Sequence, residues 1–505
     1  MATSPPRSAP RPSRPGRPAH IRRRLLFGGL LLLVVVAAVA AVVAATGGSG
    51  SVADADRLRP GSGPGEGIDP LRYTPARRTA YEARATAGSS HVLYARSIGG
   101  ITATAARVAA LRPEIEAATR GTGVDPDVLE GIVFLESGGR PDAQASNDLH
   151  GAAGLTQILA QTGTDLLGMK IDVAASTRLT KLINKGKKVA ARTALRRRVD
   201  ERFDPAKSLA ATVRYLQLAR KELGNSELAT VSYHMGIGNL QTALKKYGQG
   251  TVPYVQLYFD TSPIHHASAY AFLAGLGDDS STYLWRVRAA ELIMRRYRAD
   301  PAGLAATAVM QGHKNSAEEV LRPQASTTVF ATPADIRAAT ASGALLPLRP
   351  ARLAPDGLRV DAGMGSLGPR LGQPRRRYRA LTPDALAVLL YLGAGVQGIS
   401  GTRPLTVTSS VRDLPYQKLL TAQNIEATRA YSLHTTGNAF DFSRIYRSTA
   451  QAQATQFMLD RLTALNVIAW VREPAAIHVT AGPLARQLRG LLRPGAPTAV
   501  PVRAG

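Results

Sequence analysis

The sequence of 505 residues contains no cysteine, and its 36 acidic residues are far outnumbered by 63 Lys and Arg. Without cysteine the chain forms no internal disulfide and no thiolate metal site, so any exported part must be held by its hydrophobic cores alone. The net charge of +27 indicates an anionic partner, which could be nucleic acid, a membrane surface or an acidic wall polymer. The length is sufficient for two or three domains.

The first 46 residues predict where the chain lies in the cell. Residues 1–24 are rich in Pro, Arg and Ser, lack acidic residues and predict a disordered tail. Residues 25–46 hold an apolar run that is long enough to cross a hydrocarbon layer of ~30 Å. The run is longer than the about 7–15 apolar residues of a cleaved signal peptide, although later cleavage stays open. Because three arginines precede the run, we expect a cytoplasmic N-terminus, a single membrane span and an extracytoplasmic remainder, which excludes a nucleic-acid partner.

The stretch 125–158 holds the main candidate for catalysis. Asp125 and Pro126 are typical of a helix start, and the apolar stripe of that helix runs through Leu129, Ile132 and Val133. The next position on the stripe is Glu136, just before a Ser-Gly-Gly helix end. Burial there should raise the pKa of the carboxyl group, as a general acid requires. A lone Glu at a helix end is more often paired with Arg or with backbone donors, so Glu136 needs further support.

The residues that follow Glu136 support a catalytic role for it. They read ES, then P-x-A at 141–143, then GA-x-GL-x-Q at 151–157. This pattern resembles the active-site segment of lytic transglycosylases of the soluble, goose-lysozyme-like type. Ala145 stands where the family has a Ser, with Ser146 one place later, and the spacer that follows is longer than usual. The resemblance implies that Glu136 is the catalytic acid and that substrate contacts come from Ser137, Ser146 and Gln157.

Two later segments extend the resemblance, which covers about residues 92–300. Tyr233 precedes His234 and a Gly-x-Gly turn, similar to the family's A-Y-N-A-G-x-G segment with His in place of Asn. Tyr283 lies in a segment similar to the family's closing T-x-x-Y-V element, with the Tyr shifted. Both tyrosines are therefore expected on the substrate side, while packing alone is the alternative for Tyr233. The basic stretch 170–202 reads either as a solvated helical face or as an insertion that contacts an anionic glycan.

The chemistry implied by the resemblance needs one carboxyl group and no cofactor. Ordinary glycosidases use a pair of carboxyl groups. The nearby Asp142 and Asp148 match no family position. With one acid, the leaving oxygen takes a proton from Glu136, and the carboxylate then accepts a proton from the 6-hydroxyl of the sugar. The result would be cleavage of the MurNAc–GlcNAc bond with an anhydro end, and a muramidase with a placed water is the alternative.

A second set of motifs lies near the C-terminus. Ser432 begins an S-x-H-x-x-G-x-A-x-D segment that contains His434 and Asp441, and His478 follows on a strand-like stretch. The set resembles zinc D-Ala-D-Ala metallopeptidases and their relatives. The resemblance implies a zinc ion bound by His434, Asp441 and His478, with Arg412 as a substrate contact. The family's base is missing, since Ala475 and Ala476 occupy its positions, and Glu473 is the candidate replacement.

The sequence therefore predicts a multidomain protein with a transmembrane helix, a mainly α lysozyme-like domain and an α+β zinc-peptidase-like domain. The predicted parts are a basic cytoplasmic tail (1–24), a transmembrane helix (25–46), a linker (47–91), a lytic transglycosylase-like domain (92–300), a linker with some local structure (301–377), a metallopeptidase-like domain (378–485) and a disordered tail (486–505). We expect the protein to cut peptidoglycan glycan strands while its second domain cuts or binds stem peptides. The alternatives are a zinc-dependent wall peptidase whose first domain binds glycan, and a silent scaffold between wall and membrane.

Overall fold

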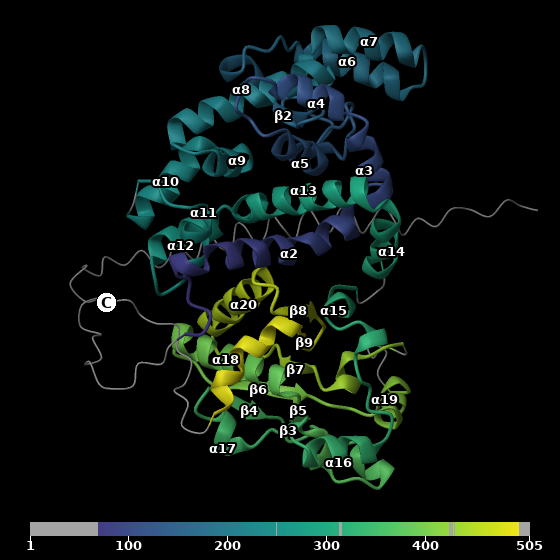
Figure 1. Cartoon of the computed structure of the whole chain (residues 1–505), viewed down its shortest axis with the longest axis vertical. Coiled ribbons are helices and arrows are strands. Elements are labelled where there is room, and N and C mark those ends of the chain that lie inside the picture. The colour runs from purple at the N-terminus through teal and green to yellow at the C-terminus, as the bar shows by residue number, and fades with distance from the viewer. Residues whose placement is uncertain (1–68, 249, 313–315, 424–427, 429, 494–505) are drawn as a thin grey trace, which may run out of the picture. The chain divides into compact units, whose positions relative to one another are not determined.

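The computed structural model describes residues 69–248, 250–312, 316–423, 428 and 430–493 (Figure 1). The predicted cytoplasmic tail and transmembrane helix lie outside these residues, as do residues 494–505 of the predicted disordered tail. The prediction of disorder was wrong for the start of that tail, because residues 486–492 belong to the 3₁₀ helix η10 (Pro483–Leu492), in which Leu488 and Leu491 are buried. Within them, one helix, α18 (Pro383–Ser400), is long and apolar enough to cross a membrane, and 72% of it is buried inside the protein. It is a core helix of the C-terminal part.

The N-terminal part of the described chain is almost entirely helical, as the sequence predicted. Its helices are α2 (Arg78–Arg96), α3 (Ile101–Ala109), α4 (Arg112–Thr119), α5 (Pro126–Ser137), α6 (Val173–Asn184), α7 (Val189–Val199), α8 (Pro205–Leu223), α9 (Ser226–Met235), α10 (Ile237–Tyr247), α11 (Tyr254–Phe259), α12 (Ala267–Gly275) and α13 (Tyr283–Ala299). A small hairpin of β1 (Ala152–Ala153) and β2 (Ile158–Leu159) lies between α5 and α6. Helix α2 begins inside the stretch that the sequence led us to expect as linker.

Helix α5 carries Glu136 and lies in the core of this part. The side chain of Asp125 caps its first turn by accepting from the backbone N–H of Asp127 at 2.8 Å, and Pro126 follows, as predicted. The helix ends at Gly138, whose φ of 59° is left-handed. Gly131 lets α5 approach α13 closely, because a Cβ atom there would lie 3.0 Å from the backbone oxygen of Val287. The two helices that hold the catalytic candidate and its partner Tyr283 are therefore packed directly together.

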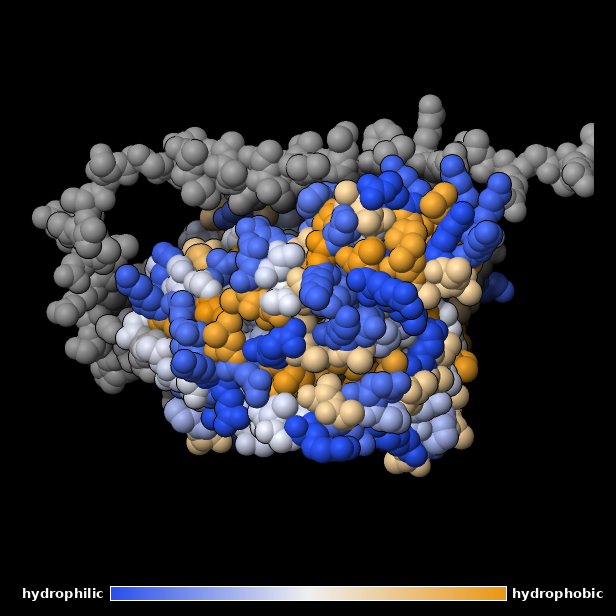
Figure 2. Space-filling view, turned by 90° about the horizontal axis from the view of Figure 1, so that it is seen from above, coloured by the Kyte–Doolittle hydropathy of each residue, from blue (hydrophilic) through white to orange (hydrophobic). Residues whose placement is uncertain are grey.

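Helices α6 and α7 form a hairpin inserted between the active-site segment and α8. Its buried anchor is Arg196, whose guanidinium lies 3.9 Å from the ring centre of Phe203 and bonds to Asp142 at 2.5 Å. Exposed apolar side chains also occur on it, at Leu182, Val189 and Leu195. Figure 2 looks down on this end of the molecule and shows apolar surface bordered by hydrophilic residues.

The C-terminal part is an α+β unit around a five-stranded sheet with the order β4-β6-β7-β9-β8 (Figure 1). The strands are β4 (Leu358–Val360), β6 (Leu405–Ser409), β7 (Ala439–Ser443), β8 (Ile468–Arg472) and β9 (Ala476–Ala481). Only the β4–β6 pair is parallel. Helix α18 packs against α20 (Thr449–Ala464), and both contact the sheet. The predicted α+β architecture is confirmed here, while a zinc-peptidase fold stays a prediction.

The stretch 301–377 contributes to this unit, except for its first helix, which packs against α2, α3 and α13 of the N-terminal part. The stretch forms α14 (Pro301–Gln311), α15 (Ser316–Leu321), α16 (Pro333–Ala341) and α17 (Pro350–Leu353), as well as the edge strand β4. It also holds β3 (Leu346–Pro347), which pairs with β5 (Ala380–Leu381). Helix α19 (Leu414–Thr421) follows β6. The sheet therefore begins before residue 378, where the sequence placed the start of the second domain.

Candidate active site and metal centre

The carboxyl group of Glu136 lies near the C-terminal end of α5 and is held by one neighbour. Tyr283, at the start of α13, donates its hydroxyl hydrogen to Glu136 Oε1 at 2.7 Å. Burial raises the pKa of Glu136 to about 7, although the hydrogen bond from Tyr283 acts in the opposite direction. A carboxyl group with this pKa is largely protonated in mildly acidic solution and about half protonated near pH 7, so it can donate a proton.

Glu130 on the same helix offers a comparison, because its carboxylate is paired with arginines. Its side chain is fully buried, and Arg298 Nη1 bonds to both of its oxygens at 2.8 Å. Arg112 adds a third contact at 3.3 Å. Among the described residues, no guanidinium and no second carboxyl group shifts the pKa of Glu136. Glu136 is therefore not the arginine-paired helix-end residue that was the alternative from the sequence.

The carboxylates of Asp142 and Asp148 bind groups other than Glu136. Asp142 pairs with Arg196 of the α6–α7 hairpin. Asp148 caps its own loop by accepting from the backbone N–H of His150 at 3.0 Å. Neither carboxylate shares the site with Glu136 as a glycosidase pair would.

Aromatic side chains form one wall beside Glu136. The rings of Tyr233 and Tyr283 stack at 6.4 Å with an angle of 22°, and the His234 ring stacks on Tyr283 at 5.1 Å. The hydroxyl of Tyr233 donates to the carbonyl oxygen of Thr156 at 2.7 Å, which joins α9 to the GA-x-GL-x-Q loop. Tyr283 is only 2% exposed, so the structure places it on the acid rather than on the surface. His234, which replaces the family's Asn, bonds to Ser280 Oγ at 2.9 Å.

The loop that ends at Gln157 has a constrained backbone. Gln157 has a φ of 53°, which is rare for a residue other than glycine. Its side-chain amide donates to the carbonyl oxygens of Gly154 and Ala143 at 2.8 and 3.2 Å. Gly154 is required, because a Cβ atom there would lie 1.8 Å from the carbonyl oxygen of Arg202. The loop and the end of the basic insertion therefore fix each other.

The two predicted serine contacts lie in different environments. Ser137 is 2% exposed, and its hydroxyl donates to the carbonyl oxygen of Val133 at 3.3 Å within α5. Ser146 is exposed in the loop, where its hydroxyl accepts from the backbone N–H of Asp148 at 3.1 Å. Of this pair, Ser146 is the one a substrate can reach.

The three predicted metal ligands come together in the C-terminal part. His434 Nε2 and His478 Nδ1 lie 3.1 and 2.7 Å from the same oxygen, Asp441 Oδ1. His478 on β9 is the register partner of Asp441 on β7, which explains their contact. All three residues are buried: the exposed fractions of His434, Asp441 and His478 are 3, 8 and 8%. They form one group in which each residue can offer one ligand atom to an ion.

The chemistry of this set fits a zinc ion. His434 Nδ1 faces the carbonyl oxygen of Ser410 at 2.8 Å and must donate to it. Its Nε2 then turns a lone pair toward the Asp441 carboxylate, an arrangement that a cation between them stabilises. Two imidazoles and one carboxylate are ligands of catalytic zinc. Burial and the Arg412 charge lower the pKa of His434 to about 4, so this imidazole is neutral at pH 7, as a ligand must be. Burial acts to lower the pKa of His478 too, but the Glu318 and Asp441 carboxylates outweigh it and raise this pKa to about 10, so a metal ion has to displace a proton from this ring.

Arg412 lies beside the metal group, and Glu473 is near enough to Arg412 to affect its pKa. Arg412 Nη2 bonds to Ser409 Oγ at 2.7 Å and approaches Asp441 Oδ2 at 3.4 Å. Burial lowers the pKa of Arg412, and the carboxylates of Asp441 and Glu473 oppose this shift. Glu473 follows β8, and its N–H donates to the Ala476 oxygen at 3.0 Å across the turn. Paired residues on antiparallel strands share a face, and so do Ala476 and His478, which are two positions apart on β9. This register therefore puts Glu473 on the same face of the sheet as His478.

Sequence reasoning missed a fourth buried group at this centre. Glu318 of α15, only 4% exposed, lies 2.7 Å from His478 Nε2 through its Oε2 atom. It is 160 residues from its partner and belongs to no motif. A Glu outside any motif, in a short helix far away in the sequence, offers no signal for such a contact.

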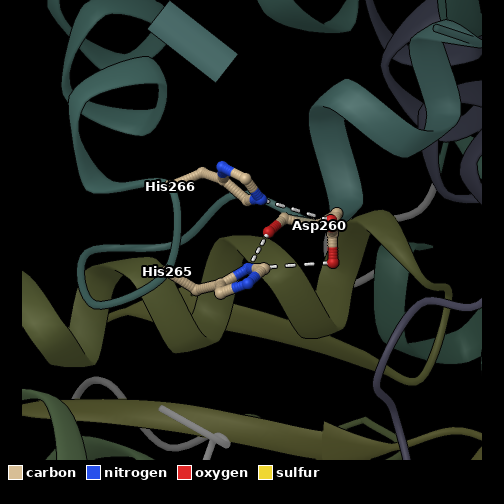
Figure 3. Close-up of side chains that lie close together, drawn as sticks. All are labelled: Asp260, His265 and His266. Carbon is tan, nitrogen blue, oxygen red and sulfur yellow. Dashed lines mark hydrogen bonds and ion pairs between the residues drawn. The ribbon is translucent and has the colours of Figure 1, made fainter. Parts of the chain in front are cut away.

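A second His and Asp group, Asp260, His265 and His266, was also not predicted (Figure 3). The Asp260 carboxylate lies beside both rings, with Oδ1 3.7 Å from His265 Nδ1 and Oδ2 3.7 Å from His266 Nε2. However, His265 Nδ1 already bonds to the backbone oxygen of Asp260 at 2.6 Å, and Tyr247 donates to Asp260 Oδ2 at 2.7 Å. These bonds tie the loop to α10 and leave His265 Nδ1 committed, so we interpret the group as structural.

Comparison with known proteins bears on the first site only. No curated protein matches the chain. Residues 113–252 match the family model described as the transglycosylase SLT domain, and this range includes Glu136, Gln157 and Tyr233. The match supports lytic transglycosylase activity on peptidoglycan and a lysozyme-like lyase domain within this longer chain.

Proposed function

We propose that this protein is a peptidoglycan lytic transglycosylase that cleaves the MurNAc–GlcNAc bond, with Glu136 as its only catalytic carboxyl group. The observation that carries the proposal is the environment of Glu136. Burial raises the pKa of its carboxyl group to about 7, Tyr283 donates a hydrogen bond to it, and among the described residues neither an arginine nor a second carboxylate shifts that pKa. The domain match at residues 113–252 supports the same activity.

The proposed reaction uses this single group twice. Glu136 first donates its proton to the glycosidic oxygen as the bond from C1 of MurNAc to that oxygen breaks. The carboxylate then accepts the proton of the 6-hydroxyl as that oxygen bonds to C1. Atoms balance without water, and the carboxyl group ends protonated. The nearby hydroxyl group of the same sugar gives the second step the advantage of proximity.

Tyr283 and Tyr233 support this cycle in different ways. The Tyr283 hydroxyl holds Glu136 in one orientation and stabilises its carboxylate once the proton has left. Tyr233 fixes the position of the Gln157 loop through Thr156, and its partly exposed ring offers a face to a sugar. Gln157 and Ser146 are the remaining proposed substrate contacts.

We extend the proposal to the C-terminal unit, where His434, Asp441 and His478 would hold zinc. When bound, zinc supplies a Lewis acid suited to amide hydrolysis. Arg412 would bind a carboxylate or carbonyl of a stem peptide, and Glu473 is the proposed base. A unit that binds stem peptides without cutting them is the alternative, because the usual base positions hold Ala475 and Ala476.

The proposed location is the outer side of the cell membrane, with the apolar run at 25–46 as a single-pass anchor. This location brings a chain of net charge +27 next to anionic wall polymers. A membrane anchor also holds the two sites near the wall layer that is closest to the membrane.

The experiment is a digest of purified murein with the full-length protein, followed by mass spectrometry of the glycan ends. We expect ends that are lighter by one water than hydrolysed ones, and none with Glu136→Gln. Hydrated reducing ends would assign the domain as a muramidase. An intact glycan, with cleaved stem peptides only, would favour the zinc peptidase with a glycan-binding first domain, and no cleavage at all would favour a scaffold.

A further inference from the structure

The segment between the two parts of the chain delivers a carboxylate to the metal centre. Glu318 lies on α15, which packs against β8. This helix lies outside the range 378–485 that the sequence assigned to the metallopeptidase-like domain. Its carboxylate is 4% exposed and lies beside the last of the three proposed ligands.

The contacts of Glu318 show that it acts on a ligand and not on the ion. Oε2 lies 2.7 Å from His478 Nε2, and Thr480 Oγ1 donates to the same oxygen at 2.7 Å. The other ring nitrogen of His478, Nδ1, faces Asp441 Oδ1 at 2.7 Å. The two nitrogens of an imidazole point in different directions, so a group bound to Nε2 is kept away from an ion bound to Nδ1. Accordingly, Glu318 is not part of the group His434, Asp441 and His478.

The other histidine is held in an equivalent way. His434 Nδ1 donates to the carbonyl oxygen of Ser410 at 2.8 Å, while its Nε2 faces Asp441 Oδ1. Each ring therefore has one nitrogen fixed by an outer acceptor and the other directed at the common point. Outer acceptors of this kind set the tautomer and orientation of metal-binding histidines.

The position of α15 is fixed by contacts that need no metal. Arg322, directly after the helix, donates through Nε to the carbonyl oxygen of Ala481 at 2.9 Å and through Nη2 to Asp384 Oδ2 at 3.0 Å. Tyr431 donates to the carbonyl oxygen of Arg322 at 3.0 Å. These bonds attach the segment to the end of β9 and to the start of α18. Loss of the Glu318 charge should therefore leave the helix in place.

We propose that Glu318 is a positioning residue that completes the metal centre: it holds His478 with its hydrogen on Nε2 and its Nδ1 lone pair free for a divalent metal ion of the zinc class. The inference rests on the proposed zinc site. It also implies that residues 378–485 alone would carry the three ligands without the group that orients one of them.

The test measures zinc affinity of the full-length protein by competition with a chromogenic chelator. Glu318→Gln keeps the shape of the side chain and removes its charge, and we expect about 10–100-fold weaker binding, as is typical when an outer carboxylate is lost. The matched control is Glu319→Gln on the same helix, which removes an equal charge and should bind zinc as the wild type does. Thr480→Val keeps Glu318 but removes one of its donors, and a smaller loss of affinity is expected.

A second readout reports on the ring itself. In ¹⁵N-histidine spectra of the zinc-loaded protein, His478 should show a hydrogen on Nε2 and a metal-bound Nδ1, and Glu318→Gln should weaken this pattern. Circular dichroism of the metal-free variants checks that they fold. If Glu318→Gln fails to fold, the result for Thr480→Val decides.

The outcomes separate two failures. A wild-type protein that binds no zinc overturns the proposed metal site. A wild-type protein that binds zinc with the same affinity as Glu318→Gln and Thr480→Val keeps the metal site and overturns the role of Glu318.

Discussion

The two sites of this protein treat charge in opposite ways. Among the described residues, no charged group shifts the pKa of Glu136, and burial raises it to about 7. At the metal centre, two histidines and two carboxylates are packed together, and Arg412 lies beside them. The first site needs a neutral acid that releases a proton, and the second needs negative and lone-pair donors that attract a cation. An added charge should therefore damage the first site, and a removed charge should damage the second.

The largest expected effect is the loss of the acid. Glu136→Gln removes the proton donor and keeps the shape and the bond from Tyr283. We expect glycan cleavage to fall by about 10²–10⁴-fold, the usual contribution of general acid catalysis. The control is Asp148→Asn, which removes a carboxylate from the nearby loop and should cut glycan normally. Activity retained by Glu136→Gln and lost by Asp148→Asn would move the catalytic role to the loop.

The second effect is the loss of a metal ligand. His434→Ala removes one imidazole from a buried group, so bound zinc, measured by elemental analysis of the purified protein, should fall below stoichiometric amounts. His150→Ala is the control, since His150 is exposed in the first part of the chain. Glycan cleavage should be unchanged in both variants. If zinc were lost from the His150 variant instead, the ligand assignment would be wrong.

A smaller effect is expected from the hydrogen bond that holds the acid. Cleavage should decline as the pH rises through about 7, because Glu136 must be protonated. The Tyr283 bond lowers the pKa of Glu136, so Tyr283→Phe should shift this decline to higher pH and slow cleavage about 2–10-fold. Tyr233→Phe, whose hydroxyl bonds to Thr156 instead, should leave the pH of the decline in place. A decline that moves in both variants would point to a general disturbance of the aromatic wall.

The smallest effect concerns stability. The folded-state pKa of Glu136 lies above the ordinary value of 4.5, so the protonated form favours folding and the wild type loses stability as pH rises through about 7. Glu136→Gln lacks this loss and should be more stable than the wild type by about 1–3 kcal/mol at pH 8, allowing for partial exposure. At pH 5 the difference should be small. Thermal melts at the two pH values measure it, and an equal difference at both would exclude a buried titrating carboxyl group.

Local signals in the sequence were sufficient for the elements that carry the ligands and the acid. Asp125 and Pro126 predicted the start of α5, because helix caps act over a few residues. The three metal-ligand candidates also followed from their motif, although whether they bind zinc is untested.

The partners of these residues could not be predicted, because they come from distant parts of the chain. Tyr283 bonds to Glu136 across 147 positions, and Glu318 reaches His478 across 160. The side of the sheet on which Glu473 lies also could not be predicted from its spacing in the sequence. The structure places a turn between Glu473 and Ala476, so the two residues belong to neighbouring strands and share a face. Such relations depend on tertiary packing and strand register, which spacing alone does not encode.

The central claim is that Glu136 is kept protonated by its surroundings, and a ¹³C NMR titration of the side-chain carboxyl carbons tests it most directly. The signal of Glu136 is assigned by its absence from Glu136→Gln, which also separates it from Glu291, whose pKa burial likewise raises to about 7. We predict a midpoint near pH 7 for Glu136. A midpoint at the ordinary value near 4.5 would mean that the carboxyl group is ionised at neutral pH, and the proposed acid would be contradicted.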